Sequence, residues 1–540
     1  MDKSVDPESG FCSETKTFHS LRPPVTLPPE TTPLSAASYA LSLQLTSPWP
    51  NPTALINSAT GRRLSYSEFA KQTKTLAASL QNLTGLSKGD TAFILSPNST
   101  QIPILYCSLL SLGIIISPAN PASTEAEISR QIKLSKPLIA FAVSSTCHKL
   151  PTMRYRTILI DSPEFESMLS SSSRELCPPV EVSQSDIAAI MYSSGTTGQV
   201  KGVMLTHRNL IAIVGIFLAQ RLERESPEVL LYTVPYFHVF GFFYSVKSVA
   251  LSETVVVMER FDLRKMLRAV EEFRVTDVAV APPVLVAMTK GDVRDGYDLR
   301  SLDKVGCGGA PLGKDVIRTF TTKFPGVLLC QGYGLTETTG SAFRAVGPEE
   351  SLRWGSVGRL NANCEAKLVD PDTGVALPPG NQGELWIRGP LVMKGYIGNP
   401  KETSETLVGD GWLRTGDLCY IDEEGFLYVV DRLKELIKYK GYQVPPAELE
   451  QLLLSHLEID DAAVIPYPDE EAGEVPMACV VRRPQSSLDE AQVVEFVAKQ
   501  VAPYKRIRRV AFTSFIPKSP AGKILRKELR NIFSGPLSRL

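Results

Sequence analysis

The sequence predicts an α/β protein of at least two domains, and three observations support this. Its 540 residues exceed what one hydrophobic core normally serves. Helical patterns alternate with short apolar runs from residue 36 to residue 430, which is typical of α/β layers. After residue 431 helices and strands mix over residues 435–540, which predicts a small C-terminal α+β domain.

The large domain is expected over residues 36–431. Its first elements are a helix over 66–83 and strands over 91–95, 113–117 and 137–143. Residues 383–396 and 425–430 are rich in strand patterns with glycine turns. They predict a β-rich subdomain that closes the large domain.

The two ends of the chain differ in character. Residues 1–35 are rich in Pro, Ser and Thr without helical or strand periodicity, so we expect a flexible N-terminal arm. The C-terminal domain is expected to contain helices over 447–456 and 488–501 and strands over 462–466 and 477–482.

The composition excludes several classes of partner. Lysine and arginine total 57 against 58 acidic residues, so no net charge favours nucleic acid or an anionic membrane. No apolar run reaches the roughly 18 residues of a membrane span, and a soluble protein is expected. Nine scattered cysteines without a CxxC pair indicate reduced thiols in an intracellular protein rather than a metal site.

Residues 193–202, SSGTTGQVKG, form the strongest local motif, between two apolar runs. Glycines allow successive backbone amides to face one point, hydroxyls add donors, and Lys201 adds a charge. This pattern predicts a strand, an anion-binding loop and a second strand, with a nucleotide triphosphate as ligand. A Ser/Thr/Gly surface hairpin is the alternative interpretation.

Two further segments carry groups that suit a nucleotide. In QGYGLTE, residues 331–337, Tyr333 can stack on a purine, Thr336 can bond a phosphate oxygen, and Glu337 can hold magnesium. In Thr415-Gly416-Asp417, an aspartate at a strand end can accept both hydroxyls of a ribose. Taken singly, each is also explained as an ordinary turn.

Basic residues cluster in two late segments. Arg432, Lys434, Lys438 and Lys440 lie in one run, which alone is explained as a solvated face. Residues 517–523, PKSPAGK, form a loop shaped by proline and glycine that presents Lys523. Alone, this lysine is explained as surface decoration.

Together, these five dispersed segments resemble the signature series of the adenylate-forming superfamily, which includes acyl-CoA synthetases and firefly luciferase. The resemblance covers about residues 36–530 and is strongest to the plant 4-coumarate CoA ligase-like clade, through residues 204–207, 309–313 and 383–389. It implies a large α/β domain, a hinge at 432–434, and a mobile C-terminal lid domain over 435–540. It also implies ATP and Mg²⁺ as cofactors and coenzyme A as cosubstrate.

The resemblance assigns the nucleotide site residue by residue. Implied contacts to the ATP phosphates are Ser193, Ser194, Gly195, Thr196, Thr197 and Lys201. Implied contacts to adenine and the α-phosphate are Gln331, Gly332, Tyr333 and Thr336, with Asp417 and Arg432 at the ribose. Glu337 is the implied magnesium ligand, and Lys523 is the implied catalytic residue of adenylation.

For the second half-reaction the resemblance implies a rotation of the lid about Lys434. Lys438 and Gln443 are then expected to face the adenylate, while Arg260, Lys440 and Gly441 contact coenzyme A. His238 is expected beside the substrate carboxylate as a catalytic residue. The acyl wall is expected to contain Phe240, Tyr244, Gly308, Gly309 and Ala310.

The implied activity is an ATP-dependent carboxylate CoA ligase acting on cinnamic and hydroxycinnamic acids. Residues 338–341, TTGS, and Phe240 depart from the usual coumarate ligase pattern and favour a less hydroxyl-specific pocket. A peroxisomal ligase for medium-chain fatty acids or oxylipin (jasmonate precursor) acids is therefore the alternative. A luciferase-like oxygenase, a silent binding protein and an adenylating partner for a carrier protein are further alternatives.

The last three residues, Ser538-Arg539-Leu540, match the pattern of a peroxisomal import signal. We therefore expect binding to the peroxisomal import receptor and a location in the peroxisome. The cytoplasm is the alternative.

Overall fold

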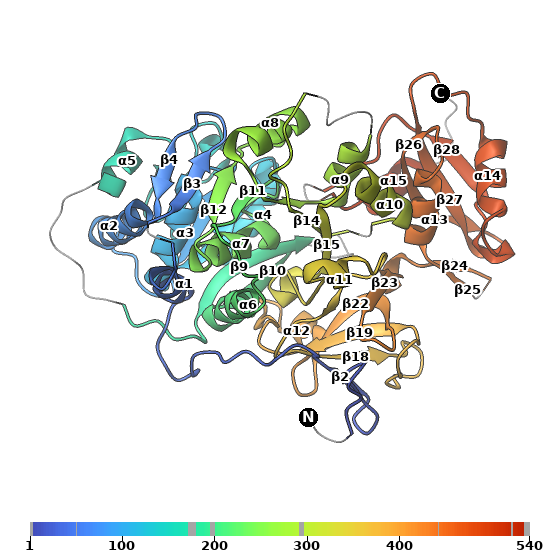
Figure 1. Cartoon of the computed structure of the whole chain (residues 1–540), viewed down its shortest axis with the longest axis horizontal. Helices are drawn as coiled ribbons and strands as arrows, with labels where there is room; N and C mark the ends of the chain where they lie inside the picture. Colours follow the sequence, from blue (N-terminus) through green and yellow to red (C-terminus); the bar gives the residue numbers. More distant parts are fainter. Residues whose placement is uncertain are drawn as a thin grey trace.

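The computed structural model describes residues 4–49, 51–170, 180–194, 200–290, 296–310, 312–440, 442–519 and 522–533. These residues form four β-sheets with helices packed around them (Figure 1). Three sheets lie before residue 433 and the fourth lies after it. This arrangement confirms the predicted α/β class with a β-rich subdomain and a smaller C-terminal α+β unit.

The largest sheet has nine strands among the described residues, and the strands from β15 to β3 run parallel. In order across the sheet they are β17 (Arg359–Leu360), β16 (Phe343–Arg344), β15 (Leu328–Tyr333), β14 (Lys304–Gly308), β13 (Asp277–Val280), β11 (Val229–Tyr232), β12 (Thr254–Val257), β3 (Thr53–Asn57) and β4 (Arg63–Ser65). Every residue of β12 and β13 is buried, as expected for parallel strands covered on both faces.

A second mostly parallel sheet contains the strands expected from the apolar runs. In order they are β20 (Gly395–Tyr396), β10 (Val200–Thr206), β9 (Ile187–Ser194), β6 (Ile115–Pro118), β5 (Thr91–Leu95), β7 (Ile139–Ala142) and β8 (Thr157–Leu159). Here β9 and β10 pair antiparallel, with Ser194 opposite Val200. The two predicted strands on either side of the first motif are therefore present, and loop residues 195–199 lie outside the described residues.

The helices of the large unit pack between and around these two sheets. They are α1 (Ala36–Leu45), α2 (Tyr66–Thr84), α3 (Gln101–Ser111), α4 (Glu125–Ser135), α5 (Pro163–Ser170), α6 (His207–Ala219), α7 (Val239–Ala250), α8 (Leu263–Phe273), α9 (Pro282–Thr289), α10 (Lys314–Lys323), α11 (Gly347–Ser351) and α12 (Pro400–Thr406). Helices α3, α6 and α7 are apolar along most of their length and buried there. They supply a large part of the main core.

The β-rich subdomain is an antiparallel sheet. Its strands are β1 (Phe11–Cys12), β2 (Thr17–His19), β18 (Glu365–Val369), β19 (Gly383–Arg388), β22 (Trp412–Ile421) and β21 (Leu407–Val408), with β23 (Leu427–Arg432) beside β22. The predicted strand-rich stretches fall in this sheet and in β20. Figure 1 shows the sheet below the two parallel ones, next to the start of the chain.

The prediction of a flexible arm over residues 1–35 is wrong for the described residues 4–35. Phe18 is 2% exposed and lies opposite Ala366 of β18, so the arm adds a hairpin to the subdomain sheet. Farther along, the Val25 N–H donates to Asn363 Oδ1 at 2.9 Å. Strands of two and three residues are too short to give a periodic pattern, so the sequence did not indicate them.

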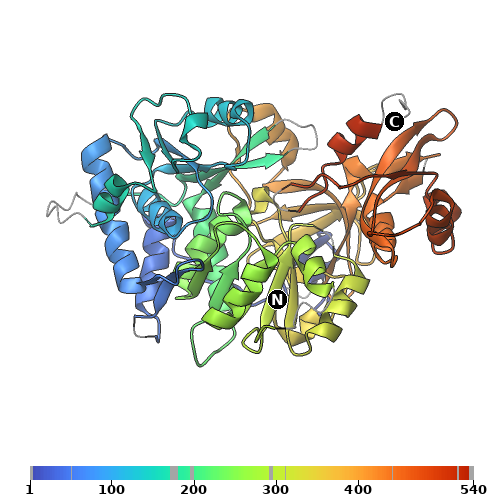
Figure 2. The ribbon, with the colours of Figure 1, turned by 90° about the horizontal axis from the view of Figure 1, so that it is seen from above.

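The C-terminal unit has its own core and its own sheet. Its strands are β25 (Tyr442–Val444), β24 (Ile437–Tyr439), β27 (Gly473–Arg482), β26 (Ile459–Asp469) and β28 (Arg509–Phe512). Its helices are α13 (Pro446–Leu454), α14 (Glu490–Ala498) and α15 (Arg526–Phe533). The short helix η3 (Leu433–Glu435) joins it to β23, and Figure 2 shows the unit at one end of the molecule.

Among the helices of the described residues, none is long and apolar enough to cross a membrane.

Candidate active site

One cavity of about 1380 Å³ extends along the ends of β14 and β15, the β9–β10 hairpin and the start of α7, and it reaches η3 and the last loop and helix of the C-terminal unit. Many residues predicted from the sequence line it together. They are Ser193, Lys201, His238, Phe240, Tyr244, Gly308, Gly309, Gln331, Gly332, Thr336, Glu337, Arg432, Lys434 and Lys523. Segments more than 300 residues apart in the sequence thus meet at one site, since both Ser193 and Lys523 line it.

Other predicted residues lie elsewhere. Tyr333, Asp417 and Ala310 are described but do not line the cavity. Arg260, Lys438, Lys440 and Gln443 are exposed and away from its wall. Gly195, Thr196, Thr197, Gly441 and the C-terminal Ser538, Arg539 and Leu540 lie outside the described residues, as does the side chain of Ser194.

The β9–β10 hairpin brings a hydroxyl and an ammonium group to the cavity. Ser193 and Lys201 are direct cross-strand partners, so their side chains share one face of the sheet. Lys201 forms an ion pair with Glu402 of α12, and its Nζ lies 4.8 Å from the centre of the Tyr396 ring. The positive charge expected beside the phosphates is therefore held in place by an acidic and an aromatic neighbour.

Glu337, in the short helix η2 (Thr336–Thr338), is held by two hydroxyl groups. Its Oε1 accepts hydrogen bonds from Ser193 Oγ at 3.2 Å and from the Tyr396 hydroxyl at 2.9 Å. A carboxylate on a cavity wall next to hydroxyl oxygens fits the hard oxygen ligands that Mg²⁺ prefers. Sequence reasoning missed Tyr396 and Glu402, since nothing in their spacing marks them.

Asp417 does not lie at a strand end, as the sequence suggested, but inside β22, opposite Arg432 of β23. Its side chain is 5% exposed, which excludes the exposed-turn interpretation. Oδ1 lies 3.2 Å from Arg432 Nε, and Oδ2 accepts a hydrogen bond from the Tyr333 hydroxyl at 2.6 Å. Burial raises the pKa of Asp417, although the Arg432 charge opposes the shift.

Lys523 reaches the cavity from a loop of the C-terminal unit. The preceding Gly522 has φ +79°, and a Cβ there would lie 2.9 Å from Pro283 Cδ of α9, so the loop requires glycine. Lys523 Nζ lies 4.0 Å from Glu435 Oε1. Burial and the nearby Arg432 charge lower the pKa of Lys523.

Glu435 is a second residue that sequence reasoning missed. It also forms an ion pair with Arg526, whose Nη2 contacts Glu450 Oε2 at 2.7 Å. Glu435 therefore links the lysine loop to the core of the C-terminal unit.

Lys438 and Gln443 are cross-strand partners in the exposed β24–β25 hairpin. Lys440 forms an ion pair with Glu471 in the same region. These residues do not line the cavity, whereas Lys523 does. Of the residues predicted in the C-terminal unit, Lys523 therefore lines the cavity. Lys438, Lys440 and Gln443, which were predicted for the second half-reaction, do not.

His238 is the N-cap of α7, and its Nδ1 accepts a hydrogen bond from the Phe240 N–H at 3.3 Å. Burial lowers the pKa of His238 to about 4, so the ring is neutral at pH 7. With Nδ1 as acceptor, the ring hydrogen is on Nε2. His238 therefore presents a neutral donor to the cavity.

Aromatic rings form the wall beyond His238. Phe240 packs edge-on against Tyr244 with ring centres 4.8 Å apart, and it stacks on Phe243. Gly308 and Gly309 line the same cavity. This part of the cavity suits a flat or aliphatic acyl body.

The family model described as AMP-binding enzyme matches residues 46–397, and the model described as AMP-binding enzyme C-terminal domain matches residues 448–523. Among curated relatives, 4-coumarate--CoA ligase-like 9 of Arabidopsis thaliana is 53% identical, with 98% of this chain and 97% of the relative covered. Peroxisomal OPC-8:0-CoA ligase 1 of the same plant is 45% identical, with 98% of each chain covered.

Solved structures give the same result. ATP-bound MatB from Rhodopseudomonas palustris is similar with a TM-score of 0.84 and 27% identity, covering 93% of this chain and 99% of that one. The o-succinylbenzoate CoA synthetase MenE from Bacillus subtilis, in complex with the acyl-adenylate OSB-AMP, has a TM-score of 0.78 and 26% identity. The shares covered are 91% of this chain and 97% of that chain.

Proposed function

The chain belongs to the AMP-binding enzyme family and is an AMP-forming acid–thiol ligase using ATP, Mg²⁺ and coenzyme A, and we propose which residues perform its two half-reactions. The observation that carries the proposal is that Lys523 lines the same cavity as Glu337 and His238, while Lys438 lies outside it. We assign residues 36–431 to an adenylating domain, 432–434 to a hinge and 435–540 to a lid.

In the first half-reaction, the acid's carboxylate oxygen bonds to the α-phosphorus of ATP while the bond to the β-phosphate oxygen breaks and pyrophosphate leaves. Lys523 stabilises the negative charge that develops on the reacting oxygens. Neutral His238 donates a hydrogen bond from Nε2 to the substrate carboxylate. It thereby orients the carboxylate without forming an ion pair with it.

The phosphates are expected beside Ser193 and Lys201, where release of Lys201 from Glu402 frees its ammonium group for them. Glu337 would hold the magnesium ion, which neutralises phosphate charge when bound. The position of Glu337 on the cavity wall supports this role, because hydrogen bonds from Ser193 and Tyr396 hold its Oε1 in place.

In the second half-reaction, the coenzyme A thiol loses its proton to solvent and its sulfur bonds to the acyl carbon. The bond from that carbon to the phosphate oxygen breaks, and AMP leaves. We propose that the C-terminal unit turns about residues 432–434, so that Lys438 and Gln443 replace Lys523 at the cavity. Lys440, Gly441 and Arg260 are then proposed to contact coenzyme A. The exposure of the β24–β25 hairpin supports this, because its polar side chains are available for a second docking.

Cinnamic and hydroxycinnamic acids are the first candidate substrates, because aromatic rings of Phe240, Phe243 and Tyr244 form the acyl wall. Medium-chain fatty or oxylipin acids are the second. A relative named for an OPC-8:0-CoA ligase supports them, as does a cavity of about 1380 Å³ that continues beyond the aromatic rings.

The test is thioester formation by purified protein with ATP, Mg²⁺ and coenzyme A across cinnamic, benzoic, medium-chain fatty and cyclopentenone acids. Preference for ring acids would support the first candidate, and preference for aliphatic or cyclopentenone acids the second. No thioester from any acid would contradict the substrate classes proposed here.

For location, we propose the peroxisome, with Ser538-Arg539-Leu540 bound by the import receptor. The name of the peroxisomal relative supports this. A fluorescent protein fused to the N-terminus should enter peroxisomes and should lose that location when the tripeptide is deleted. Cytoplasmic fluorescence from the intact fusion would contradict the proposal.

A further inference from the structure

The far end of the cavity contains a guanidinium group without an acidic partner. Arg344, in β16, lines the cavity next to Gly332, where an added Cβ would lie 3.7 Å from Arg344 Cβ. Its Nε and Nη2 donate to the neutral Gln220 Oε1 at 2.9 and 2.5 Å. Among the described residues, no carboxylate oxygen lies within 4.0 Å of its guanidinium nitrogens.

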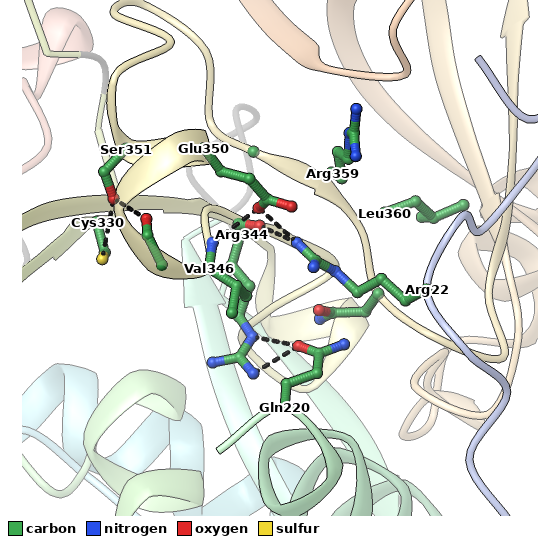
Figure 3. A network of polar contacts seen from close by, with 12 residues as sticks. Arg22, Gln220, Cys330, Arg344, Val346, Glu350, Ser351, Arg359 and Leu360 are labelled. Carbon is green, nitrogen blue, oxygen red and sulfur yellow. Dashed lines mark hydrogen bonds and ion pairs between the residues drawn. The ribbon is translucent and has the colours of Figure 1, made fainter. Parts of the chain in front are cut away.

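Glu350, an acidic neighbour of Arg344, pairs with another residue. Glu350 Oε2 pairs with Arg22 Nη2 at 2.7 Å and accepts the Val346 N–H at 2.7 Å. Figure 3 shows Arg22 reaching Glu350, while the Arg344 side chain faces Gln220. Arg22 also donates to the Arg344 carbonyl at 2.8 Å, and the Arg344 guanidinium lies 3.8 Å from the centre of the Phe217 ring, so it is stacked on an aromatic ring but has no carboxylate partner.

Two neighbouring donors in the same wall lack acceptors. Gln220 Nε2 and Arg221 Nη2 are buried nitrogens without a hydrogen-bond partner in the described part of the chain, and both residues line the cavity. An unpaired buried donor lowers the stability of the folded protein, so an acceptor that binds to it is stabilising. Arg344, Gln220 and Arg221 together form a set of donors that we call the distal donor set.

The other charged residues at this end do not supply the acceptor. Lys247 pairs with Glu253 at 2.6 Å, and Lys304 pairs with Asp277 at 2.8 Å and Glu228 at 3.3 Å. Burial and the Arg22 charge lower the pKa of Arg344 to about 10, and it still carries its charge at neutral pH. No described side chain outside the distal donor set therefore supplies an acceptor to it.

Resting on the proposed function, we propose that the distal donor set binds an oxygen acceptor at the far end of the acyl substrate, so the preferred acids carry a keto group or a second carboxylate there. The reacting carboxylate lies near His238, and the acyl body passes Phe240 and Tyr244 toward Arg344. A guanidinium fork suits a carboxylate or carbonyl oxygen. An acid without this acceptor leaves the buried donors unpaired, which penalises it more than a missing methylene does.

The alternative is that Arg344 only braces β16 against Gln220, at the end of α6. A brace would affect stability but would not distinguish substrates by their distal group. The experiment therefore compares substrates within each variant.

The test uses straight-chain acids of several lengths, each as the plain acid, with a distal keto group, and as the dicarboxylic acid. In the wild type, kcat/KM for one or both acceptor acids should exceed that for the plain acid by about 10- to 100-fold. Arg344→Leu should remove most of this ratio, and Arg344→Lys should restore part of it. Comparison of the keto acids with the dicarboxylic acids shows whether the preferred distal group is a ketone or a carboxylate.

The matched control is the double variant Arg22→Gln with Glu350→Gln, which removes the ion pair behind Arg344 without releasing a carboxylate to it, and neither residue lines the cavity. It should lower Tm and change kcat/KM for plain and acceptor acids by the same factor. A wild type that does not favour either acceptor acid, or a preference that survives Arg344→Leu, overturns the inference.

If no acid forms a thioester, the proposed substrate classes fail, and binding still tests the distal donor set. Calorimetric titration of the same acids into the full-length protein with a nonhydrolysable ATP analogue should show tighter binding of an acceptor acid. Equal binding of plain and acceptor acids overturns the inference independently of turnover.

Discussion

Glu435 lies between Lys523, whose Nζ is 4.0 Å from Oε1, and Arg526, with which it forms an ion pair. Lys523 thus has one carboxylate, Glu435, beside its ammonium group. Glu435 raises the pKa of Lys523, whereas the Arg432 charge lowers it. The arrangement holds Lys523 at the cavity while Lys438 remains on an exposed hairpin.

Glu435→Gln should shift the alkaline limb of adenylation to lower pH. Burial and Arg432 already lower the pKa of Lys523, and Glu435 is the first anion that raises it, so its removal lowers this pKa further. ATP–pyrophosphate exchange measured against pH checks the shift. Glu471→Gln, which removes the exposed partner of Lys440, is the control, and an unmoved alkaline limb in Glu435→Gln contradicts the role of Glu435.

Gly522→Ala should impair adenylation selectively. The alanine would need a backbone φ of +79°, and its Cβ would lie 2.9 Å from Pro283 Cδ. This costs about 1–2 kcal/mol, which corresponds to roughly a 5- to 30-fold loss of rate. Conversion of a supplied acyl-adenylate to thioester should persist. Gly374→Ala has φ +72° but open space, so it is the matched control, and equal effects of the two variants would count against the loop's role.

Asp417→Asn should destabilise the protein by about 1–3 kcal/mol and raise the KM for ATP, because it removes the charge opposite Arg432. Tyr333→Phe removes only the hydrogen bond to Asp417, so its cost should be about 1 kcal/mol. Denaturant unfolding measures both variants. A larger loss from the tyrosine change would contradict the importance of the ion pair.

Stability should fall as pH falls from about 6.5 toward 4, in part through His238. Its pKa is lowered from 6.5 to about 4 in the folded state, so in this window the unfolded state binds the proton more readily and folding weakens. The contribution is on the order of 3 kcal/mol. His238→Gln should flatten the curve of unfolding free energy against pH, whereas His148→Gln at an exposed site should not; identical curves for all three proteins would exclude this contribution.

The local motifs could be predicted from sequence because each combines residue types within a few positions. Ser193, Lys201, Glu337 and Lys523 were identified in this way, and the structure brings them to one cavity. Contacts between distant segments have no such local pattern. Tyr396 and Glu402 therefore became visible only through their contacts with Glu337 and Lys201.

The same reason explains the other differences. The sequence changes at Phe240 and residues 338–341 favoured a more apolar pocket, yet Arg344 places a charged group at the far end of the cavity. Its lack of an acidic partner depends on Arg22, 322 residues earlier, occupying Glu350. The N-terminal hairpin likewise depends on pairing with β18, which its short strands do not predict.

The most direct test of the account separates the two half-reactions in Lys523→Ala and Lys438→Ala. Lys523→Ala should lose ATP–pyrophosphate exchange by about 100-fold or more while still converting a supplied acyl-adenylate and coenzyme A to thioester. Lys438→Ala should retain exchange and lose the second step. Equal loss of both steps in either variant would contradict the proposal that one cavity is served in turn by two faces of the C-terminal unit.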